Sequence, residues 1–248
     1  MNKTVVLEIC ADSIESAIAA ERGGAHRIEL CGALAEGGVT PSSGLITAVR
    51  SRMTLPLYII VRPRGGDFLY SSDEFEIMRH DVLTARRLGA DGVVLGILRE
   101  DGTVDVERTR TLIEIARPMQ VTFHRAFDMS SDLGRALEDV ILTGADRILT
   151  SGGEQSAEAG ISNIAAVVKQ AAGRIAVMAG AGINLTNVRD ILDRTGVREI
   201  HTTARAKISS RMQYRNQQLS MGLMEGREYE QFVTMEEKVS ELSAVLAQ

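Results

Sequence analysis

The stretch "GGAHRIELC" (residues 23–31) shows the unit from which this chain is built. Glycine closes a helical segment, and a short run of alternating polar and apolar residues, typical of a strand, follows at once. The same design returns in "LGADGVVLG" (88–96), "TGADRILTSG" (143–152) and "TGVREIHTT" (195–203). The copies, marked by Gly24, Gly89, Gly144 and Gly196, are 65, 55 and 52 residues apart, which is one βαβα unit each. The recurrence predicts four such units, although the general preference of helix ends for glycine would also produce it.

Strand-like runs alternate with amphipathic helical stretches along the whole chain. The predicted strands are Thr4–Ile9, Arg27–Cys31, Leu57–Val61, Gly92–Leu95, Gln120–Phe123, Asp146–Thr150, Ile175–Ala179 and Glu199–Thr202. The predicted helices lie near 13–23, 42–51, 73–87, 105–116, 132–142, 157–172, 184–194 and 228–247. Eight alternations in 248 residues are typical of a (β/α)8 TIM barrel with a single closed parallel sheet. The rival fold, a doubly wound open sheet, usually stops at about five to seven strands. We therefore predict one domain over residues 1–248, with a long loop at 203–228 after the eighth strand.

Composition excludes several classes of partner. Hydrophobic residues make up 44% of the chain and charged residues 25%, with a net charge of −5, as in an ordinary soluble protein. No basic run predicts nucleic acid, no apolar run is long enough to cross a membrane, and no nucleotide cofactor is expected. No secretory signal is recognised, so we expect a cytoplasmic protein. Two cysteines are too few for a disulfide framework, and such a compartment would keep them reduced.

The two cysteines stand in two matching stretches, "LEIC" (7–10) and "IELC" (28–31). Side chains alternate along a strand, and the wholly apolar positions should face the helices. Glu8, Cys10, Glu29 and Cys31 are then expected to point into the barrel from neighbouring strands. Each cysteine comes last in its strand, at the C-terminal rim where barrel sites lie.

The predicted barrel interior is unusually polar. By the same alternation, the inward charged or titratable residues are Glu8, Arg27, Glu29, Arg62, His124, Arg147, Glu199 and His201. Buried charge is costly unless it is paired. An ion-pair network that joins Arg27 and Arg147 to Glu8, Glu29 and Glu199 would explain the middle of the barrel, but not the residues at its rim.

The loops at the rim carry groups suited to an anion and to acid–base chemistry. "VRPRGGD" (61–67) offers Arg62 and Arg64, whose guanidinium forks bind phosphate or carboxylate, unless Asp67 pairs with them. "FHRAFD" (123–128) offers His124 with Arg125 and Asp128. Ser151, Gly152, Gly180 and Gly182 lie in small-residue loops after the sixth and seventh strands, where free backbone N–H groups favour an anion.

These stretches together resemble a known family. "LEICADSIESA", "GGAHRIELCGALAEGGVTPS", "VRPRGGDFLYS", "VTFHRAFDM", "RILTSG", "MAGAGI" and "YRNQQLSMG" are similar, in order and nearly end to end, to the CutC copper homeostasis family. The resemblance implies a cytosolic (β/α)8 barrel linked to copper tolerance. It also implies that the cysteines of the motifs matching "EIC" and "ELC", here Cys10 and Cys31, bind Cu(I).

Two functions remain open at this point. The first is copper handling, because soft thiolates select Cu(I), with buried inert thiols as the plain alternative. The second is an enzyme for a small anionic or phosphorylated substrate, with Glu8, Glu29 and His124 as catalytic acid–base candidates. The arginines and glycine loops, together with Asp128 and Ser151, would then hold the anion. Zinc hydrolysis by His124, His201, Glu8 and Glu29 is a third idea without a supporting spacing motif. The long 203–228 segment favours a homo-oligomer, most simply a dimer.

Overall fold

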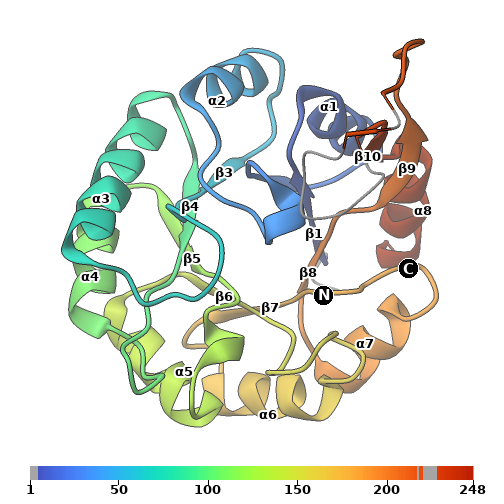
Figure 1. Ribbon diagram of the computed structural model, residues 1–248. Coiled ribbons are helices and arrows are strands. Elements are labelled where there is room, and N and C mark those ends of the chain that lie inside the picture. The colour runs from blue at the N-terminus through green and yellow to red at the C-terminus, as the bar shows by residue number, and fades with distance from the viewer. Residues whose placement is uncertain (1–4, 217, 220–227, 248) are drawn as a thin grey trace.

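Eight parallel strands form a closed barrel, and the helices that connect them form a ring around it (Figure 1). The structure, a computed structural model, describes residues 5–216, 218–219 and 228–247. The strands are β1 (Val6–Ala11), β2 (Arg27–Leu30), β3 (Leu57–Ile60), β4 (Gly92–Leu95), β5 (Gln120–Phe123), β6 (Arg147–Thr150), β7 (Ala176–Ala179) and β8 (Glu199–Thr202). Each strand pairs with the next one, and β8 pairs with β1. The predicted TIM barrel is confirmed, and the pairing of β8 with β1 excludes an open sheet.

Capping residues mark the starts of several helices, and glycines follow the ends of others. They are α1 (Ile14–Arg22), α2 (Ser43–Arg50), α3 (Ser72–Arg87), α4 (Val106–Ala116), α5 (Leu133–Thr143), α6 (Ile161–Ala171), α7 (Val188–Thr195) and α8 (Glu236–Leu246), with short 3-10 helices η1 (Leu34–Glu36) and η2 (Phe127–Met129). Ser13 and Ser42 accept a backbone N–H at the starts of α1 and α2, and Ser71 forms a capping box with Glu74 at the start of α3. All four glycines of the repeat have a positive φ, the backbone conformation that favours glycine.

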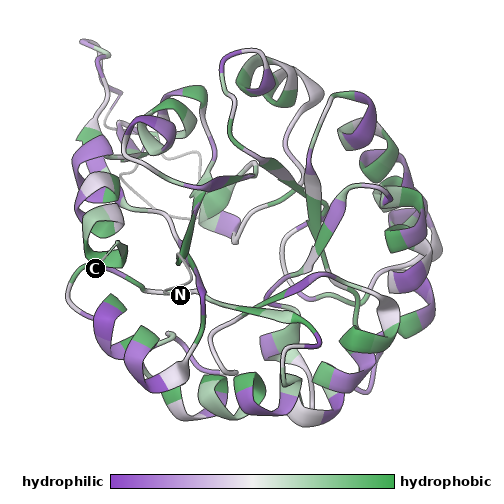
Figure 2. Cartoon of the chain, turned by 180° about the vertical axis from the view of Figure 1, so that it is seen from behind, coloured by the Kyte–Doolittle hydropathy of each residue, from purple (hydrophilic) through white to green (hydrophobic). Residues whose placement is uncertain are grey.

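The strands present apolar side chains outward to the ring of helices. Leu7, Ile9, Ile28 and Leu30 are fully buried in this layer. Hydrophobic residues of the helices gather on the sides that face the strands, while the outer sides are hydrophilic (Figure 2). The predicted alternation of β1 and β2 is therefore correct, and it leaves Glu8, Cys10 and Glu29 inside the barrel.

Charged residues fill the middle of the barrel, where branched apolar residues are usual. Arg27 donates to Glu8 and, over 2.6 Å, to Glu199. Arg147 donates to the same Glu199 carboxylate. The predicted ion-pair network is thus confirmed for four of its five residues. Glu29 lies outside it, because its carboxylate faces β8 instead.

The segment after β8 differs from the prediction. In place of an irregular loop, β9 (Arg205–Ser209) and β10 (Glu230–Thr234) form an antiparallel two-stranded sheet beside α8 and α1 (Figure 1). The last helix begins at Glu236 rather than near 228, because residues 230–234 pair with β9. Residues 217 and 220–227 of the predicted loop lie outside the described residues. Within the described ranges, no helix combines the length and the apolar character needed to cross a membrane.

Candidate metal site and its cavity

The two cysteines meet at the C-terminal mouth of the barrel. Cys10 Sγ and Cys31 Sγ lie 3.7 Å apart, and both thiols are free. Both residues are almost completely buried. The two inward side chains of neighbouring strands therefore bring their sulfurs together, and no disulfide joins them.

Strand register explains how the sulfurs meet. Cys10 is level with Glu29, and not with Cys31, because the barrel offsets β1 from β2. Cys31 comes just after β2, where its N–H donates to the carbonyl of Ala11 over 3.0 Å. The two side chains therefore approach diagonally. Gly38 covers Cys31 from the loop that carries η1, since a Cβ at Gly38 would lie 3.2 Å from Cys31 Cβ.

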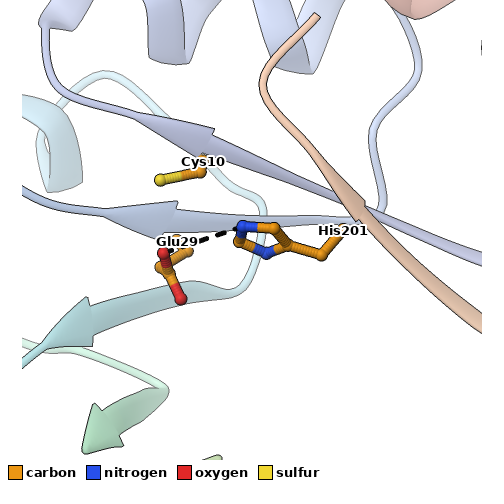
Figure 3. Close-up of side chains that lie close together, drawn as sticks. All are labelled: Cys10, Glu29 and His201. Atoms are coloured by element: carbon orange, nitrogen blue, oxygen red, sulfur yellow. Dashed lines mark ion pairs between the residues drawn. The ribbon is translucent and has the colours of Figure 1, made fainter. Parts of the chain in front are cut away.

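Glu29 and His201 bring further ligand atoms to this place. One ligand atom each from Cys10, Glu29 and His201 lie within 4.8 Å of one another. The three side chains point toward a common centre from β1, β2 and β8 (Figure 3). His201 Nε2 is 4.0 Å from Glu29 Oε1. The cluster includes two residues of the zinc hypothesis, Glu29 and His201, but neither His124 nor Glu8.

Glu8 contacts the cluster through His201. Its Oε1 lies 2.7 Å from His201 Nδ1, so the carboxylate fixes the imidazole ring and leaves Nε2 toward Glu29. Carboxylates orient metal-binding histidines in the same way. Burial alone raises the pKa of Glu8, but the charge of Arg27 and the contacts with His201 outweigh it and lower the pKa to about 2. Glu8 is therefore a fixed negative charge at neutral pH.

The other groups of the cluster are shifted toward their protonated forms. The hydrogen bond with Cys31, together with burial, raises the pKa of the Cys10 thiol well above its usual value. Burial also raises the pKa of Glu29. Burial lowers the pKa of His201, but the charges of Glu29 and Glu8 outweigh it and the pKa is raised. A metal ion that binds here must therefore displace protons.

A cavity of about 200 Å³ opens beside the cluster. Its lining includes the three residues of the cluster, Cys10, Glu29 and His201, and also Arg62, His124 and Arg125. The remaining walls are Leu34, Gly37, Ile60, Phe68, Leu149 and Thr203. Cys10 lines the cavity and Cys31 lies behind it, so an ion that enters from the mouth meets Cys10 first.

Several residues predicted to hold an anion are paired within the protein. Arg64 donates to Asp67 over 3.0 Å and to Glu74 over 2.6 Å, and it does not line the cavity. Arg125 lines the cavity but pairs with Asp128 over 2.7 Å.

Asp128 also accepts hydrogen bonds from backbone N–H groups of the loop after β6. The backbone N–H groups of Ser151 and Gly153 donate to its carboxylate over 3.0 Å, as does the Ser151 hydroxyl over 2.9 Å. Gly152 N–H donates instead to the Thr150 hydroxyl. The loop after β6 therefore already holds an anionic group, which is the protein's own carboxylate.

The loop after β7 faces a second cavity. Gly182 lines this larger space of about 630 Å³ together with Lys238 and Arg205. The two cavities share Leu34, Gly37, Arg125, His201 and Thr203, so they adjoin. Gly180 lines neither cavity and instead leaves room for its neighbours, because a Cβ there would lie 2.6 Å from Leu149 Cδ1 and 3.3 Å from His201 Cβ.

Sequence reasoning missed Gly96 and Phe68. A Cβ at Gly96 would lie 2.7 Å from His124 Nδ1, so this glycine makes room for the imidazole ring. The Phe68 ring lies 4.9 Å from the His124 ring and 5.0 Å from the Arg62 guanidinium carbon. The position of Gly96 just after β4 was the only available signal, since rim positions of a barrel shape its site.

Comparison with known proteins agrees with this fold. The sequence matches the model of the CutC family over residues 5–206. A human protein named copper homeostasis protein cutC homolog is 47% identical over 241 residues, which cover 97% of this chain and 88% of that protein. A CutC family protein of Xylella fastidiosa is 52% identical over 211 residues, which cover 85% of this chain and 79% of that protein.

Solved structures give the same result. A crystal structure of CutC from Streptococcus agalactiae superposes with a TM-score of 0.77 at 33% identity and covers 80% of this chain and 98% of that one. Thiamine phosphate pyrophosphorylase from Pyrococcus furiosus, 20% identical with a TM-score of 0.59, covers 98% of this chain and 96% of that one, and it shares the fold alone. This chain belongs to the CutC family, whose human relative is named a copper homeostasis protein.

Proposed function

We propose that this protein binds Cu(I) through Cys10 and Cys31, with His201 as a third donor. The observation that carries the proposal is the pair of free thiols, buried 3.7 Å apart at the mouth of the barrel. Thiolates are soft ligands that select Cu(I) over harder divalent ions. The names of the relatives as copper homeostasis proteins support the same metal.

The spacing of the sulfurs favours a bent arrangement with room for a third ligand. Two metal–sulfur bonds of about 2.3 Å, the length found in zinc thiolates, would place collinear sulfurs about 4.6 Å apart. The observed 3.7 Å is shorter, so an ion held by both sulfurs would lie to one side of the line that joins them. Glu8 holds the His201 ring in place and leaves Nε2 available, and this ring shares a cluster with Cys10 and Glu29, although not with Cys31. A cytoplasmic location is part of the proposal, because a reducing compartment keeps both thiols free.

Anaerobic titration of Cu(I) against a competing chelator tests the site. We expect wild type to bind one Cu(I) per chain. A Cys10→Ser, Cys31→Ser double variant should lose more than the roughly 100-fold that removal of a supporting group costs. Met129→Leu is the control, because this exposed thioether is a soft ligand far from the thiol pair in sequence. Equal affinity of wild type and the double variant would contradict the proposal.

The enzyme alternative has weaker support from the same geometry. Glu8 is fully buried, is held by Arg27 and His201, and does not line the cavity. Burial lowers the pKa of His124 to about 3, which moves it away from neutral pH. Glu29 is the one acid–base candidate of the three that lines the cavity with a pKa shifted toward neutrality. Copper binding is therefore the function that the geometry supports better.

A further inference from the structure

Arg62 is a buried cation that has no anionic partner among the described residues. Only 6% of its surface is exposed. Its guanidinium donates to three backbone carbonyls, those of Glu36 and Gly38 over 2.9 Å and that of Gly66 over 2.7 Å. No carboxylate of the described residues lies within 4.0 Å of it, whereas Arg27 and Arg147 deeper in the barrel are both paired. A buried charge without a counter-charge is costly.

The neighbouring hydroxyl does not supply the missing charge. Tyr70 is buried near Arg62, and its hydroxyl has no hydrogen-bond partner among the described residues. Burial raises the pKa of Tyr70 to about 12 in spite of the charge of Arg62. Tyr70 is therefore neutral, and the positive charge of Arg62 is left to be balanced from the cavity that it lines.

His124 offers an unused donor on the same side of this cavity. Its exposed fraction is 4%. The Ala126 N–H donates to His124 Nδ1 over 3.2 Å, which assigns the ring proton to Nε2. Nε2 has no acceptor among the described residues. Phe68 lies against both the imidazole and the guanidinium, so the two groups share one wall.

We propose that the cavity binds a small carboxylate anion, which neutralises Arg62 and accepts the Nε2–H of His124. The inference goes beyond copper binding and does not depend on it. Neither Arg62 nor His124 belongs to the cluster of Cys10, Glu29 and His201. Buried donors are normally satisfied, but Arg62 Nε and His124 Nε2 both lack a partner among the described residues, and both residues line this cavity. Burial and the charge of Arg62 keep His124 neutral, so it serves as a donor at neutral pH without adding a second positive charge.

Size and donor chemistry favour a carboxylate over a phosphate. The cavity of about 200 Å³ is smaller than the ~300 Å³ at which common ligand pockets begin, so it suits a molecule of few heavy atoms. Leu34, Ile60, Phe68 and Leu149 give it apolar walls for a short carbon chain. A phosphate would need further donors for its three oxygens. The N–H groups of Ser151 and Gly153, in the loop after β6, already donate to Asp128.

Calorimetric titration of the copper-free full chain tests the proposal. The probes are acetate, lactate and succinate, with lactamide as a neutral match for lactate and inorganic phosphate as the competing anion. We expect at least one carboxylate to bind, lactamide to bind at least about tenfold more weakly than lactate, and phosphate to bind more weakly than the best carboxylate.

Two variants of His124 form a matched pair. His124→Asn keeps an acceptor for the Ala126 N–H but removes the ε nitrogen, and should weaken carboxylate binding by about tenfold or more. His124→Gln places an amide N–H near the lost position and should restore part of the affinity. Arg64→Gln is the control, because this arginine of the same loop lies outside the cavity. A third variant, Arg62→Met, removes the guanidinium and with it three backbone contacts. If this variant fails to fold, the His124 pair still tests the proposal.

The outcomes separate this proposal from copper binding. A Cys31→Ser variant should weaken Cu(I) binding and retain the carboxylate, because Cys31 does not line the cavity. The proposal is overturned if no carboxylate binds, if lactamide binds as tightly as lactate, or if phosphate binds more tightly than every carboxylate. Unchanged affinity in His124→Asn would overturn it as well.

Discussion

At the scale of single residues, Glu8 holds together the ion pairs of the barrel and the imidazole of the candidate metal site. One oxygen of its carboxylate accepts from Arg27, and the other meets His201 Nδ1. The sequence predicts that Glu8 points inward, but its role follows from two contacts that lie 19 and 193 residues away in the chain. We infer that Glu8 is a structural and positioning residue.

Replacement of Glu8 should therefore destabilise the fold in a pH-dependent way. Its folded pKa of about 2 lies below the ordinary value of 4.5, so its contribution is present above pH 4.5 and is lost as the pH falls toward 2. Glu8→Gln should lower the free energy of unfolding at pH 7 by on the order of 3 kcal/mol, and the deficit should shrink over that acid range. Urea denaturation from pH 7 to 3 measures it. Glu138→Gln, which breaks an exposed pair with Arg174, should have a much smaller effect. Equal deficits for the two variants would contradict this role.

Copper binding should tighten as the pH rises. The pKa of the Cys10 thiol is raised, so the thiol is protonated at neutral pH and must release its proton to bind Cu(I). Each proton released gives about a tenfold gain in affinity per pH unit below the thiol pKa. Competition titrations from pH 6 to pH 8 should show at least this slope. A flat profile would mean that Cys10 does not bind as a thiolate.

At the scale of elements, the loop that carries η1 covers the cysteine that the cavity does not reach. Gly38 has a φ of +85°, and a Cβ there would lie 3.2 Å from Cys31 Cβ and 3.3 Å from Ile60 Cδ1. The same loop supplies two of the carbonyls that hold Arg62. A change in this loop should therefore affect both the thiol pair and the cavity that Arg62 lines.

A pair of glycine substitutions tests this cover. Gly38→Ala should lower stability by roughly 1–2 kcal/mol for the left-handed backbone, and by more for the contact with Cys31. Gly144→Ala is matched to it, because its φ is +83° and nothing lies within 4 Å of the added methyl group. Thermal or urea denaturation should show the larger loss in Gly38→Ala, together with weaker Cu(I) binding that Gly144→Ala does not show. Equal losses of stability in the two variants would mean that the loop moves to accommodate the added methyl group, and that Gly38 is not needed to cover Cys31.

Elements were also the scale at which the sequence was most informative. Hydrophobic alternation and the recurring glycines predicted eight strands, their closure, and the inward direction of Cys10 and Glu29. Alternation carries no information about height along the barrel axis, so the 3.7 Å between the sulfurs required the register of β1 and β2. Nor did it show that Asp128 takes the N–H groups of Ser151 and Gly153, since such pairing depends on how a loop folds back.

At the scale of the whole molecule, the β9–β10 sheet is the part that departs from the barrel. Among the described residues, β9 pairs on one side only, and an unpaired strand edge is a surface that invites association. Ile208 and Met212 are exposed by 38% and 58%, and both line a groove beside α1. An exposed apolar surface next to a strand edge marks an interaction site.

We predict that two copies of the chain associate through this sheet as a homodimer. Sedimentation of wild type at micromolar concentration should give a mass near twice the 26.9 kDa of one chain. An Ile208→Asp, Met212→Asp variant should sediment as a monomer, because two charges would be buried in the interface without partners. Leu142→Asp is the matched control, since Leu142 is 63% exposed on α5, away from the sheet. A monomeric wild type, or a dimer that survives the double substitution, would place the interface elsewhere or remove it. If the dimer forms as predicted, the two-stranded sheet serves association and the barrel mouth serves ligand binding. Cys10, Glu29 and His201 do not line the groove, so the two surfaces are separate.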